Sequence, residues 1–528
     1  MAAVRVPLPE FAKRFLEQMP GDPLDDTIPR QVHGALWSRV QPTPVAAPRL
    51  LAFSRPLARE LGLSDALMQD AETARVLSGN ALWPGMDPYA ANYGGHQFGQ
   101  WAGQLGDGRA IVLGELERPD RAFAELQLKG AGPTAYSRRG DGRAVLRSSI
   151  REFLCSEAMF HVGVPTTRAL SLVLTGDDVV RDMFYDGNAK AEPGAIVCRV
   201  AESFLRFGNF ELPSSRGDVA LLKKLTDFTL THFFPHLGTP GKDSYGAFLR
   251  DVAQRTARLI AHWQAVGFVH GVMNTDNLSI LGLTIDYGPY GWIDNFDLGW
   301  TPNTTDAQQK RYCFGNQPGI GLWNVERLGV ALLPLVDGEE RVVHEALGEY
   351  QKVYAEDATH RFAAKLGITF SAESGDGELL EDLFEWLAAA ETDMTLFFRG
   401  LSRVVLDAAP TELPSVVRTA FYGPVAEAHV AAGLAWLQRW WQRVRAEPRS
   451  SSDIASAMDA VNPKFVLRNW LAQEAIDAAH ADDLSKVQRL LTVMERPFDE
   501  QPGNDDLAQK RPEWARSKPG CSALSCSS

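Results

Sequence analysis

The chain has 528 residues, 45% of them hydrophobic, which is enough to bury a sizeable core and suggests about two to four domains. Its formal net charge of −13 leaves no excess of lysine and arginine to neutralise phosphates, so we expect no nucleic-acid partner. Five cysteines do not make a disulfide framework in so long a chain, and we find neither a signal segment nor an apolar run of about 18 residues. We therefore expect a cytoplasmic protein that does not bind membranes.

Residues 1–88 combine short helical patterns with frequent prolines. Proline has no backbone N–H to donate, so it interrupts helices. We interpret this segment as an N-terminal extension that wraps a domain, with one helix expected near residues 56–63.

Glycine becomes frequent from Tyr93 onward, in the stretch YGGHQFGQWAGQLGDGR. Closely spaced glycines indicate backbone conformations that a Cβ atom would forbid, or the close approach of a ligand. Gly106, Asp107 and Gly108 form a turn before a predicted strand, and the neighbouring Arg109 suits a phosphate group. The stretch fits neither a dinucleotide-binding fingerprint nor a P-loop, so from this turn alone phosphate contact stays an open interpretation.

Residues 123–129 (FAELQLK) alternate apolar and polar side chains, which predicts a half-buried strand that ends at Lys129. An amphipathic helix is predicted over residues 147–160, with Glu152 toward the edge of its apolar face. Protein kinases pair a strand lysine with a helix glutamate to hold phosphate, and the spacing here matches that arrangement. A surface lysine and an unrelated glutamate are the alternative.

The sequence GDGRA occurs twice, at residues 106–110 and 140–144, which suggests two glycine turns on the same side of one small sheet. Arg199 and Arg206 follow this region and are suited to bind phosphate oxygens through two hydrogen bonds each. Ordinary surface ion pairs are the alternative. Two further strands are predicted, at residues 169–174 and 195–200.

The stretch HGVMNTDNLSILGLTIDYG, residues 270–288, contains two short apolar runs on either side of a glycine, which predict a hairpin. The hairpin would hold Asn277 just before its first strand and Asp286 just after its second, side by side. Their oxygen atoms suit a Mg²⁺ ion that also binds phosphates, as in the catalytic loop of protein kinases. The position of the kinase base is Val272 here, and the nearest free carboxylate is Asp276. Ordinary turn-forming residues are the alternative.

Amphipathic helical patterns dominate residues 324–472. Within them, Trp436, Trp440 and Trp441 are interpreted as core packing rather than as a ligand site. From Asp499 onward the chain is polar and rich in proline and glycine, which predicts a mobile tail.

Four stretches and a terminal Cys-Ser-Ser together resemble the selenoprotein O family, also called YdiU, from about Leu36 to the C-terminus. The stretches are YGGHQFGQWAGQLGDGR, LQLKGAGPTAYSRRGDGRAVLRSSIREFL, HGVMNTDNLSILGLTIDYGP and NPKFVLRN. The resemblance implies an α+β, protein-kinase-like fold with two lobes. It also implies a protein adenylyltransferase, which moves AMP from ATP to Ser, Thr or Tyr hydroxyls of proteins with Mg²⁺ or Mn²⁺. Transfer of UMP from UTP is also attributed to bacterial members.

The resemblance further implies roles for single residues. Asp276 matches the proton acceptor, and Asn277 and Asp286 match the metal ligands. Glu152 matches the ion-pair partner of the phosphate-binding lysine. ATP in this family lies flipped relative to kinases, so that its α-phosphorus faces the acceptor. The matches to nucleotide-binding positions are Gly106, Gly108, Arg109, Lys129, Asp141, Gly142, Arg199, Arg206 and Asp286.

Cys526 stands at the antepenultimate position, where some relatives carry selenocysteine, which suggests redox control. Cys521 and Cys313 are both candidate partners for a disulfide, and the sequence does not choose between them. An inert exposed thiol is the alternative.

We expect a monomer with a β-rich lobe at residues 89–215, a mostly helical lobe at 216–495 and a flexible tail at 496–528. The expected reaction is AMP transfer from ATP, with Asp276 as the base. The alternatives are a kinase that transfers the γ-phosphoryl group and a nucleotide-binding redox scaffold.

Overall fold

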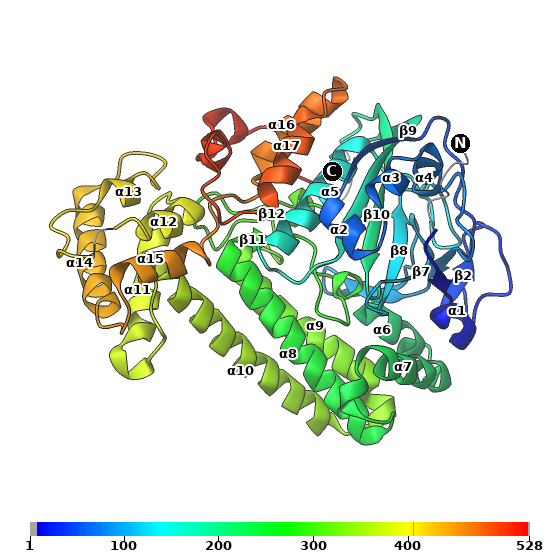
Figure 1. The fold of residues 1–528 in the computed structure, drawn as a ribbon. Coiled ribbons are helices and arrows are strands. Elements are labelled where there is room, and N and C mark those ends of the chain that lie inside the picture. The colour runs from blue at the N-terminus through cyan, green and yellow to red at the C-terminus, as the bar shows by residue number, and fades with distance from the viewer. Residues whose placement is uncertain (1–7, 185, 405, 526–528) are drawn as a thin grey trace.

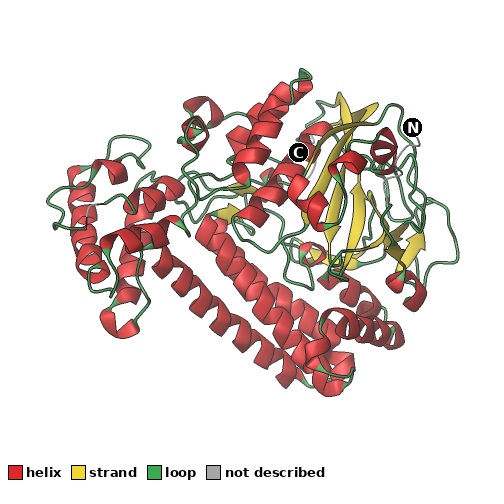
Figure 2. Cartoon of the chain, viewed as in Figure 1, coloured by secondary structure: helices red, strands yellow, loops and turns green. Residues whose placement is uncertain are grey.

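The N-terminal part of the chain forms a large antiparallel sheet, whose strands are among those drawn in yellow in Figure 2. The computed structural model describes residues 8–184, 186–404 and 406–525. Eight strands pair in the order β2-β4-β7-β8-β10-β9-β3, with β1 beside β7. Their bounds are β1 Phe11–Ala12, β2 Trp37–Arg39, β3 Arg49–Phe53, β4 Tyr89–Ala91, β7 Ala110–Glu117, β8 Phe123–Lys129, β9 Arg168–Arg181 and β10 Lys190–Ala201.

The register of the central strands brings several polar residues to one end of the sheet. Strand β8 has the bounds that its alternating pattern predicts, and β9 and β10 contain the other two predicted strands. Arg199 of β10 lies opposite Gln127 of β8. Lys129, the last residue of β8, lies opposite Ala110, so it is next to the turn that ends at Arg109.

Both faces of this sheet are buried, because helices cover each of them (Figure 1). Helices α2, α3 and α4 from the N-terminal segment pack on one face, and α5 packs on the other. The predicted extension therefore does more than wrap a domain, since it supplies β1–β3 and a covering layer for an apolar sheet face. The helix bounds are α2 Arg55–Glu60, α3 Asp65–Met68, α4 Ala71–Val76 and α5 Leu146–His161.

Helices make up most of the remaining chain (Figure 1). The long helices α8 and α10 run side by side, and α16 and α17 return to pack against α5. Helix α8 ends at Gly267, whose φ of +76° is the left-handed conformation typical of a helix C-terminus. The bounds are α1 Arg14–Gln18, α6 Phe207–Ser215, α7 Val219–Phe233, α8 Lys242–Val266, α9 Gln317–Leu332, α10 Glu340–Lys365, α11 Asp376–Ala388, α12 Met394–Leu401, α13 Ser415–Arg418, α14 Glu427–Val444, α15 Ser451–Asp459, α16 Asn469–His480 and α17 Ser485–Met494.

The predicted tryptophan packing is present in α14. Trp436 and Trp440 are buried in the core of helices α11–α15, and their indole N–H groups donate to the carbonyls of Leu379 and Leu366. Each ring therefore buries its apolar body and satisfies its one donor, as expected for core residues.

One segment has the length and composition of a membrane-spanning helix. It covers Phe314–Val336, with a mean hydropathy of 1.3 in its most apolar window, and half of that window is buried in the structure. A core helix of a folded domain shows the same features, so the segment is weak support for a membrane span.

Residues 499–525 are packed against the rest of the chain, in contrast to the mobile tail that their composition predicts. Leu524 is 0% exposed, and its backbone N–H donates to the carbonyl of Pro302 at 2.9 Å. Asn469 Nδ2 donates to the carbonyl of Cys521, also at 2.9 Å. Composition misjudges this segment because a few apolar residues and backbone hydrogen bonds dock it onto a surface formed elsewhere in the chain.

The described residues include four cysteines, all of them buried and free of disulfides: Cys155, Cys198, Cys313 and Cys521. Burial raises the pKa of the Cys521 thiol to about 11, which makes it a poor nucleophile. Cys526 lies outside the described residues, so its redox role stays a prediction.

Arg468, from the NPKFVLRN stretch, joins the helical region to the segment that follows β12 (Gly291–Trp292). It is 2% exposed, and it donates to Asp294 at 3.0 Å and to Asp393 at 2.9 Å. Asp393 also caps the N-terminus of α12 and accepts from the hydroxyl of Tyr422. The motif therefore places one buried cation between two carboxylates from different parts of the chain.

Replacing Arg468 by methionine should lower the free energy of unfolding by about 3–5 kcal/mol, because two carboxylates lose their buried counterion. Denaturant unfolding followed by circular dichroism measures this loss. Arg439→Met is the matched control, since Arg439 pairs with Asp382 at a surface where the side chains are 49% and 48% exposed. The control should cost less than about 1 kcal/mol, and equal losses in the two variants would contradict the assignment.

Candidate active site

The loop from His270 to Gly288 connects β11 (Phe268–Val269) with its antiparallel partner β12. A hydrogen bond between His270 Nε2 and the carbonyl of Ile285, at 2.8 Å, joins the two ends of this loop. Burial lowers the pKa of His270, so the ring is neutral at pH 7 and serves as a structural tie. The predicted hairpin is reduced to one antiparallel bridge between Leu278 and Thr284.

Asp286 is placed between two arginines from the sheet side of the molecule. Its carboxylate accepts from Arg199 Nη1 at 2.5 Å and from Arg206 Nη1 at 2.6 Å. Burial alone would favour the neutral acid, but the charges of Arg206, Arg199 and Lys129 outweigh it and hold the pKa of Asp286 below its ordinary range. The backbone of Asp286 is left-handed, with a φ of +57°, a conformation that is uncommon outside glycine and often found at functional sites.

Lys129 and Glu152 form an ion pair, with Nζ and Oε2 2.5 Å apart. Arg199 also contacts this carboxylate, at 3.3 Å. Burial lowers the pKa of Lys129, and the neighbouring Glu152 opposes that shift. Strand β8 and helix α5 therefore hold the lysine at the end of the sheet, beside the Asp286 cluster.

A cavity of about 620 Å³ lies between the glycine turns and the loop. Glu152, Arg206 and Asp276 do not line it, but Glu152 and Arg206 bind residues that do. The cavity therefore gathers most of the predicted nucleotide and metal residues in one place. Those in its lining are Gly106, Gly108, Arg109, Lys129, Asp141, Gly142, Arg199, Asn277 and Asp286.

The two glycine turns have a packing reason that is independent of any ligand. A Cβ on Gly106 would collide with the ring of Tyr136, and its φ is +72°. A Cβ on Gly142 would collide with the backbone of Gly132, and its φ is +68°. These glycines are therefore required for the turns to form, and their contact with a nucleotide stays a prediction.

Asp141, at the second turn, is held by Arg181 through two hydrogen bonds of 2.7 Å each. Burial raises the pKa of Asp141, but the bonds to Arg181 and to the backbone outweigh it, so the group is ionised at neutral pH. Sequence reasoning missed Arg181, because it lies 40 residues away on β9 and has no local pattern of its own.

Asp107, in the lining of the cavity, and Gln127 belong to a buried polar network that sequence reasoning also missed. Asp107 accepts from Tyr93 and from Gln127, each at 3.2 Å, and Gln127 accepts in turn from Arg199. Burial raises the pKa of Asp107, and the charges of Arg206 and Arg199 partly offset it. The alternation of β8 contains the missed signal, since it puts Gln127 on the same face as Lys129.

Asp276 lies against a hairpin formed by β5 (Gly94–Gln97) and β6 (Gln100–Gln104) rather than in the lining of the cavity. It is 7% exposed and accepts from Gln97 Nε2 at 3.2 Å. Burial raises its pKa to about 7, against the lowering effects of Gln97 and Arg206. Its backbone carbonyl accepts from Arg206 at 2.9 Å, so the same arginine contacts both Asp276 and Asp286.

Asn277 faces the cavity and donates through Nδ2 to the carbonyl of Val272 at 3.0 Å. That bond leaves its amide oxygen as the atom suited to a metal. Asn277 and Asp286 supply two hard oxygen ligands, the set that suits a divalent ion also bound by phosphates and water. Among the described residues, no group of three or more His, Cys, Asp or Glu side chains is arranged to hold a metal by itself.

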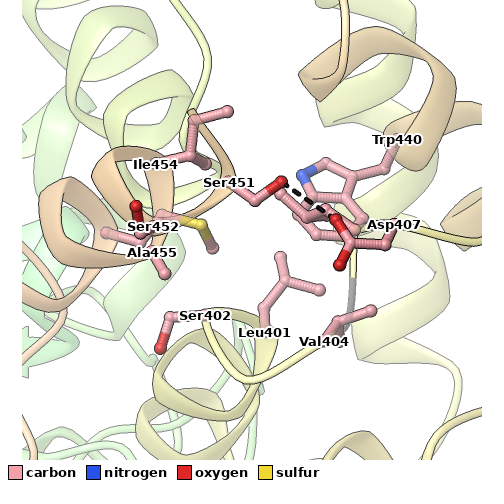
Figure 3. A pocket seen from close by; sticks show the side chains of 11 residues that line it. Leu401, Ser402, Val404, Asp407, Trp440, Ser451, Ser452, Ile454 and Ala455 are labelled. Atoms are coloured by element: carbon pink, nitrogen blue, oxygen red, sulfur yellow. Dashed lines mark hydrogen bonds between the residues drawn. The ribbon is translucent and has the colours of Figure 1, made fainter. Parts of the chain in front are cut away.

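A second cavity, of about 220 Å³, lies among helices α12, α14 and α15 (Figure 3). Trp440 lines it, and at its rim Ser451 Oγ contacts Asp407 Oδ1 at 3.5 Å. None of the predicted site residues lines this cavity, so it does not contribute to the site described above.

Comparison with known proteins gives one consistent result. Residues 30–495 match the model of a family described as protein adenylyltransferase SelO. A protein nucleotidyltransferase YdiU of Aromatoleum aromaticum is 58% identical over 525 residues, covering 98% of each chain. Proteins with the same name from Xanthomonas campestris pv. campestris and Nitrosospira multiformis are 57% and 53% identical, over 98% of this chain and over 99% and 96% of their own lengths.

Replacing Glu152 by glutamine should lower the free energy of unfolding by about 3–5 kcal/mol, because Lys129 and Arg199 lose a shared buried counterion. Denaturant unfolding provides the measurement. Glu72→Gln is the control, since Glu72 pairs with Arg75 where both side chains are more than half exposed. A Glu152 variant as stable as the control would show that this pair adds nothing to the fold.

Proposed function

The chain belongs to the SelO family and is a protein nucleotidyltransferase, and we propose that it transfers AMP from ATP to serine, threonine or tyrosine hydroxyls of proteins. The observation that carries this proposal is the cluster at the end of the cavity. There, Lys129, Arg199 and Arg206 surround Asp286, and Asp276 precedes it on the same loop. Such a cluster supplies positive charge for phosphate oxygens and a carboxylate for a proton.

The proposed fold is protein-kinase-like, with the sheet and α5 as the small lobe and the helices from α7 onward as the larger one. The Lys129–Glu152 pair between a strand and a helix supports this assignment, as does the loop after β11. We keep the boundaries at 89–215 and 216–495, although β1–β3 add the preceding segment to the same sheet.

Asn277 and Asp286 would hold Mg²⁺ or Mn²⁺, and the bound ion would supply positive charge to the phosphates of ATP. The chain's own cations complete that role. Lys129 and Arg199 line the cavity and are buried, so they are fixed in place before the nucleotide arrives and lose little freedom on binding it, and the buried Arg206 adds its charge from behind Asp286. Arg109 lines the cavity beside the first turn and is suited to the outer phosphates.

In the proposed reaction, Asp276 accepts the proton of the acceptor hydroxyl. The hydroxyl oxygen forms a bond to the α-phosphorus of ATP, and the bond between that phosphorus and the oxygen bridging to the β-phosphate breaks. Pyrophosphate leaves with the bonding electron pair, and its new negative charge is offset by Lys129 and the two arginines. Transfer of UMP from UTP would follow the same steps, because the residues named here interact with phosphates.

We also propose a cytoplasmic location. The cysteines of the described residues are unpaired, which supports a reducing compartment.

ATP labelled at either the α- or the γ-phosphate separates nucleotidyl transfer from phosphoryl transfer. With Mg²⁺ or Mn²⁺ and a mixed protein acceptor, only the α label should become bound to protein, because the AMP group is transferred and pyrophosphate is released. A parallel reaction with α-labelled UTP tests UMP transfer. Protein-bound label from the γ position alone would make this chain a kinase.

Asp276→Ala should reduce the rate of labelling by about 100-fold or more, because the acceptor hydroxyl loses its base. ATP binding should persist, since Asp276 does not line the cavity. Asp297→Ala is the matched control, because Asp297 is exposed and its carboxylate only caps its own turn through Gly299 N–H. An Asp276 variant that labels at the unmodified rate would remove Asp276 from the mechanism.

A further inference from the structure

The hairpin of β5 and β6, residues 94–104, is joined to the sheet side at its base and packs along α6, where His96 Nδ1 contacts Glu211 Oε1 at 2.6 Å. Its two strands form a separate two-stranded sheet and do not pair with the main one. The base is closed by Tyr93, whose carbonyl accepts from the backbone N–H groups of Leu105 and Gly106. The remainder of the hairpin is therefore free of the main ladder and projects over the loop that follows β11.

Strand β5 and the turn after it are hydrogen-bonded to that loop. His96 N–H donates to Thr275 Oγ1 at 2.7 Å, and Phe98 N–H donates to Asn274 Oδ1 at 3.1 Å. Gln97 contacts the Asp276 carboxylate, as described above. These bonds hold the hairpin down on the residues around the proposed base.

The hairpin covers Asp276 with backbone. A Cβ on Gly95 would lie 2.7 Å from Asp276 Oδ1, so only glycine allows β5 to pack directly on the carboxylate. Oδ1 is buried and has no hydrogen-bond partner. With the hairpin in this position, an acceptor hydroxyl has no room at the Asp276 carboxylate. When Asp276 is ionised, Oδ1 is also kept from water, and no hydrogen bond replaces its lost hydration.

The turn of the same hairpin covers a second charged group, Arg311. A Cβ on Gly99 would lie 3.3 Å from Arg311 Cζ. The Nε and Nη2 atoms of Arg311 are buried and have no hydrogen-bond partner. The guanidinium is held in place by Trp323, whose ring centre is 4.8 Å away. Arg311 is therefore pre-oriented, with two donors unused under the hairpin.

Aromatic groups surround this position. Trp101, on β6, is 38% exposed, and its ring lies 5.1 Å from that of His96. His96 also contacts Trp323 edge-on, at 5.5 Å. Exposed aromatic and arginine side chains are the residues that most often anchor protein partners.

We infer that the 94–104 hairpin is a lid and that the acceptor protein binds under it as an extended segment with an acidic side chain on Arg311. This inference rests on the proposed function, because it places the acceptor hydroxyl on Asp276. Lifting the hairpin uncovers the Asp276 carboxylate and the two unused N–H donors of Arg311 at once. A protein segment with a hydroxyl for Asp276 and a carboxylate for Arg311 satisfies both groups. A basic segment would leave Arg311 unpaired.

The hairpin itself sets the expected spacing in the acceptor. Gly95 of β5 covers Asp276, and Gly99, in the turn after β5, covers Arg311, so the two contacts are four residues apart along the hairpin. At roughly 3.3 Å per residue, that distance is at most about 13 Å. An extended acceptor should therefore carry its acidic residue three or four positions from the modified hydroxyl.

The test uses the full chain, α-labelled ATP and synthetic peptides with one serine, threonine or tyrosine. Glutamate, glutamine or lysine is placed three or four positions away on either side. The glutamate peptides should show a kcat/KM about tenfold higher than the glutamine peptides, because a charge-assisted pair forms in the complex. Arg311→Met should remove that preference and leave the KM for ATP unchanged, whereas Arg311→Glu should transfer the preference to lysine.

Arg341→Met is the matched control, because the Arg341 side chain on α10 is 75% exposed. It should keep the preference for glutamate. The kcat/KM values of the three peptides can be compared on the unmodified chain. That comparison therefore tests the preference for an acidic residue even if an Arg311 variant does not fold. Equal kcat/KM values for the three peptides would overturn the inference while α-labelling itself still supports the proposed function. No α-labelling of any peptide or protein would instead overturn the proposed function.

Hydrogen exchange tests the lid separately. Binding of a glutamate peptide, with the acceptor hydroxyl replaced by hydrogen, should speed exchange at the amides of His96 and Phe98, because their bonds to the loop are broken. Slower exchange at these two amides would show that the hairpin stays closed over the acceptor and would overturn the lid.

Discussion

The half-buried Asp286 carboxylate, held between Arg199 and Arg206, makes the interaction on which the rest of the site depends. The two arginines come from β10 and from the start of α6, and Asp286 comes from the loop after β11. The two ion pairs of Asp286 therefore join the sheet to the helical part of the chain. Because the two arginines are buried, loss of Asp286 would leave their charges without this shared counterion.

The same cluster is close to electrically balanced before any nucleotide binds. Lys129 and the two arginines face Glu152 and Asp286, with the buried Asp107 behind them. A triphosphate adds negative charge to this set, and a divalent ion at Asn277 and Asp286 would offset part of it. The arrangement explains why so many charged groups are tolerated inside a fold whose core is otherwise apolar.

In the proposed mechanism, Asp276 lies between the nucleotide side of the site and the acceptor side. The cavity with the glycine turns lies on one side, and the 94–104 hairpin lies on the other. Gly95, Gln97 and Gly99 would then belong to the acceptor side, although they occur in the same glycine-rich stretch as Gly106 and Gly108. One glycine-rich stretch therefore contributes both to the cavity and to the hairpin over Asp276. The spacing of its glycines does not show which glycine belongs to which of the two.

The sequence by itself determined the elements whose signal is local. Alternation placed Lys129 at the end of β8, helical periodicity placed Glu152 on α5, and the short runs around Gly282 located the loop with Asn277 and Asp286. Tertiary structure decided the contacts between distant segments, such as Arg181 with Asp141 and the hairpin with Asp276. It also docked residues 499–525, which composition alone describes as a mobile tail. Periodicity reports which face of an element is buried, but the partner of that face is chosen by packing across the whole chain, and no local pattern encodes that choice.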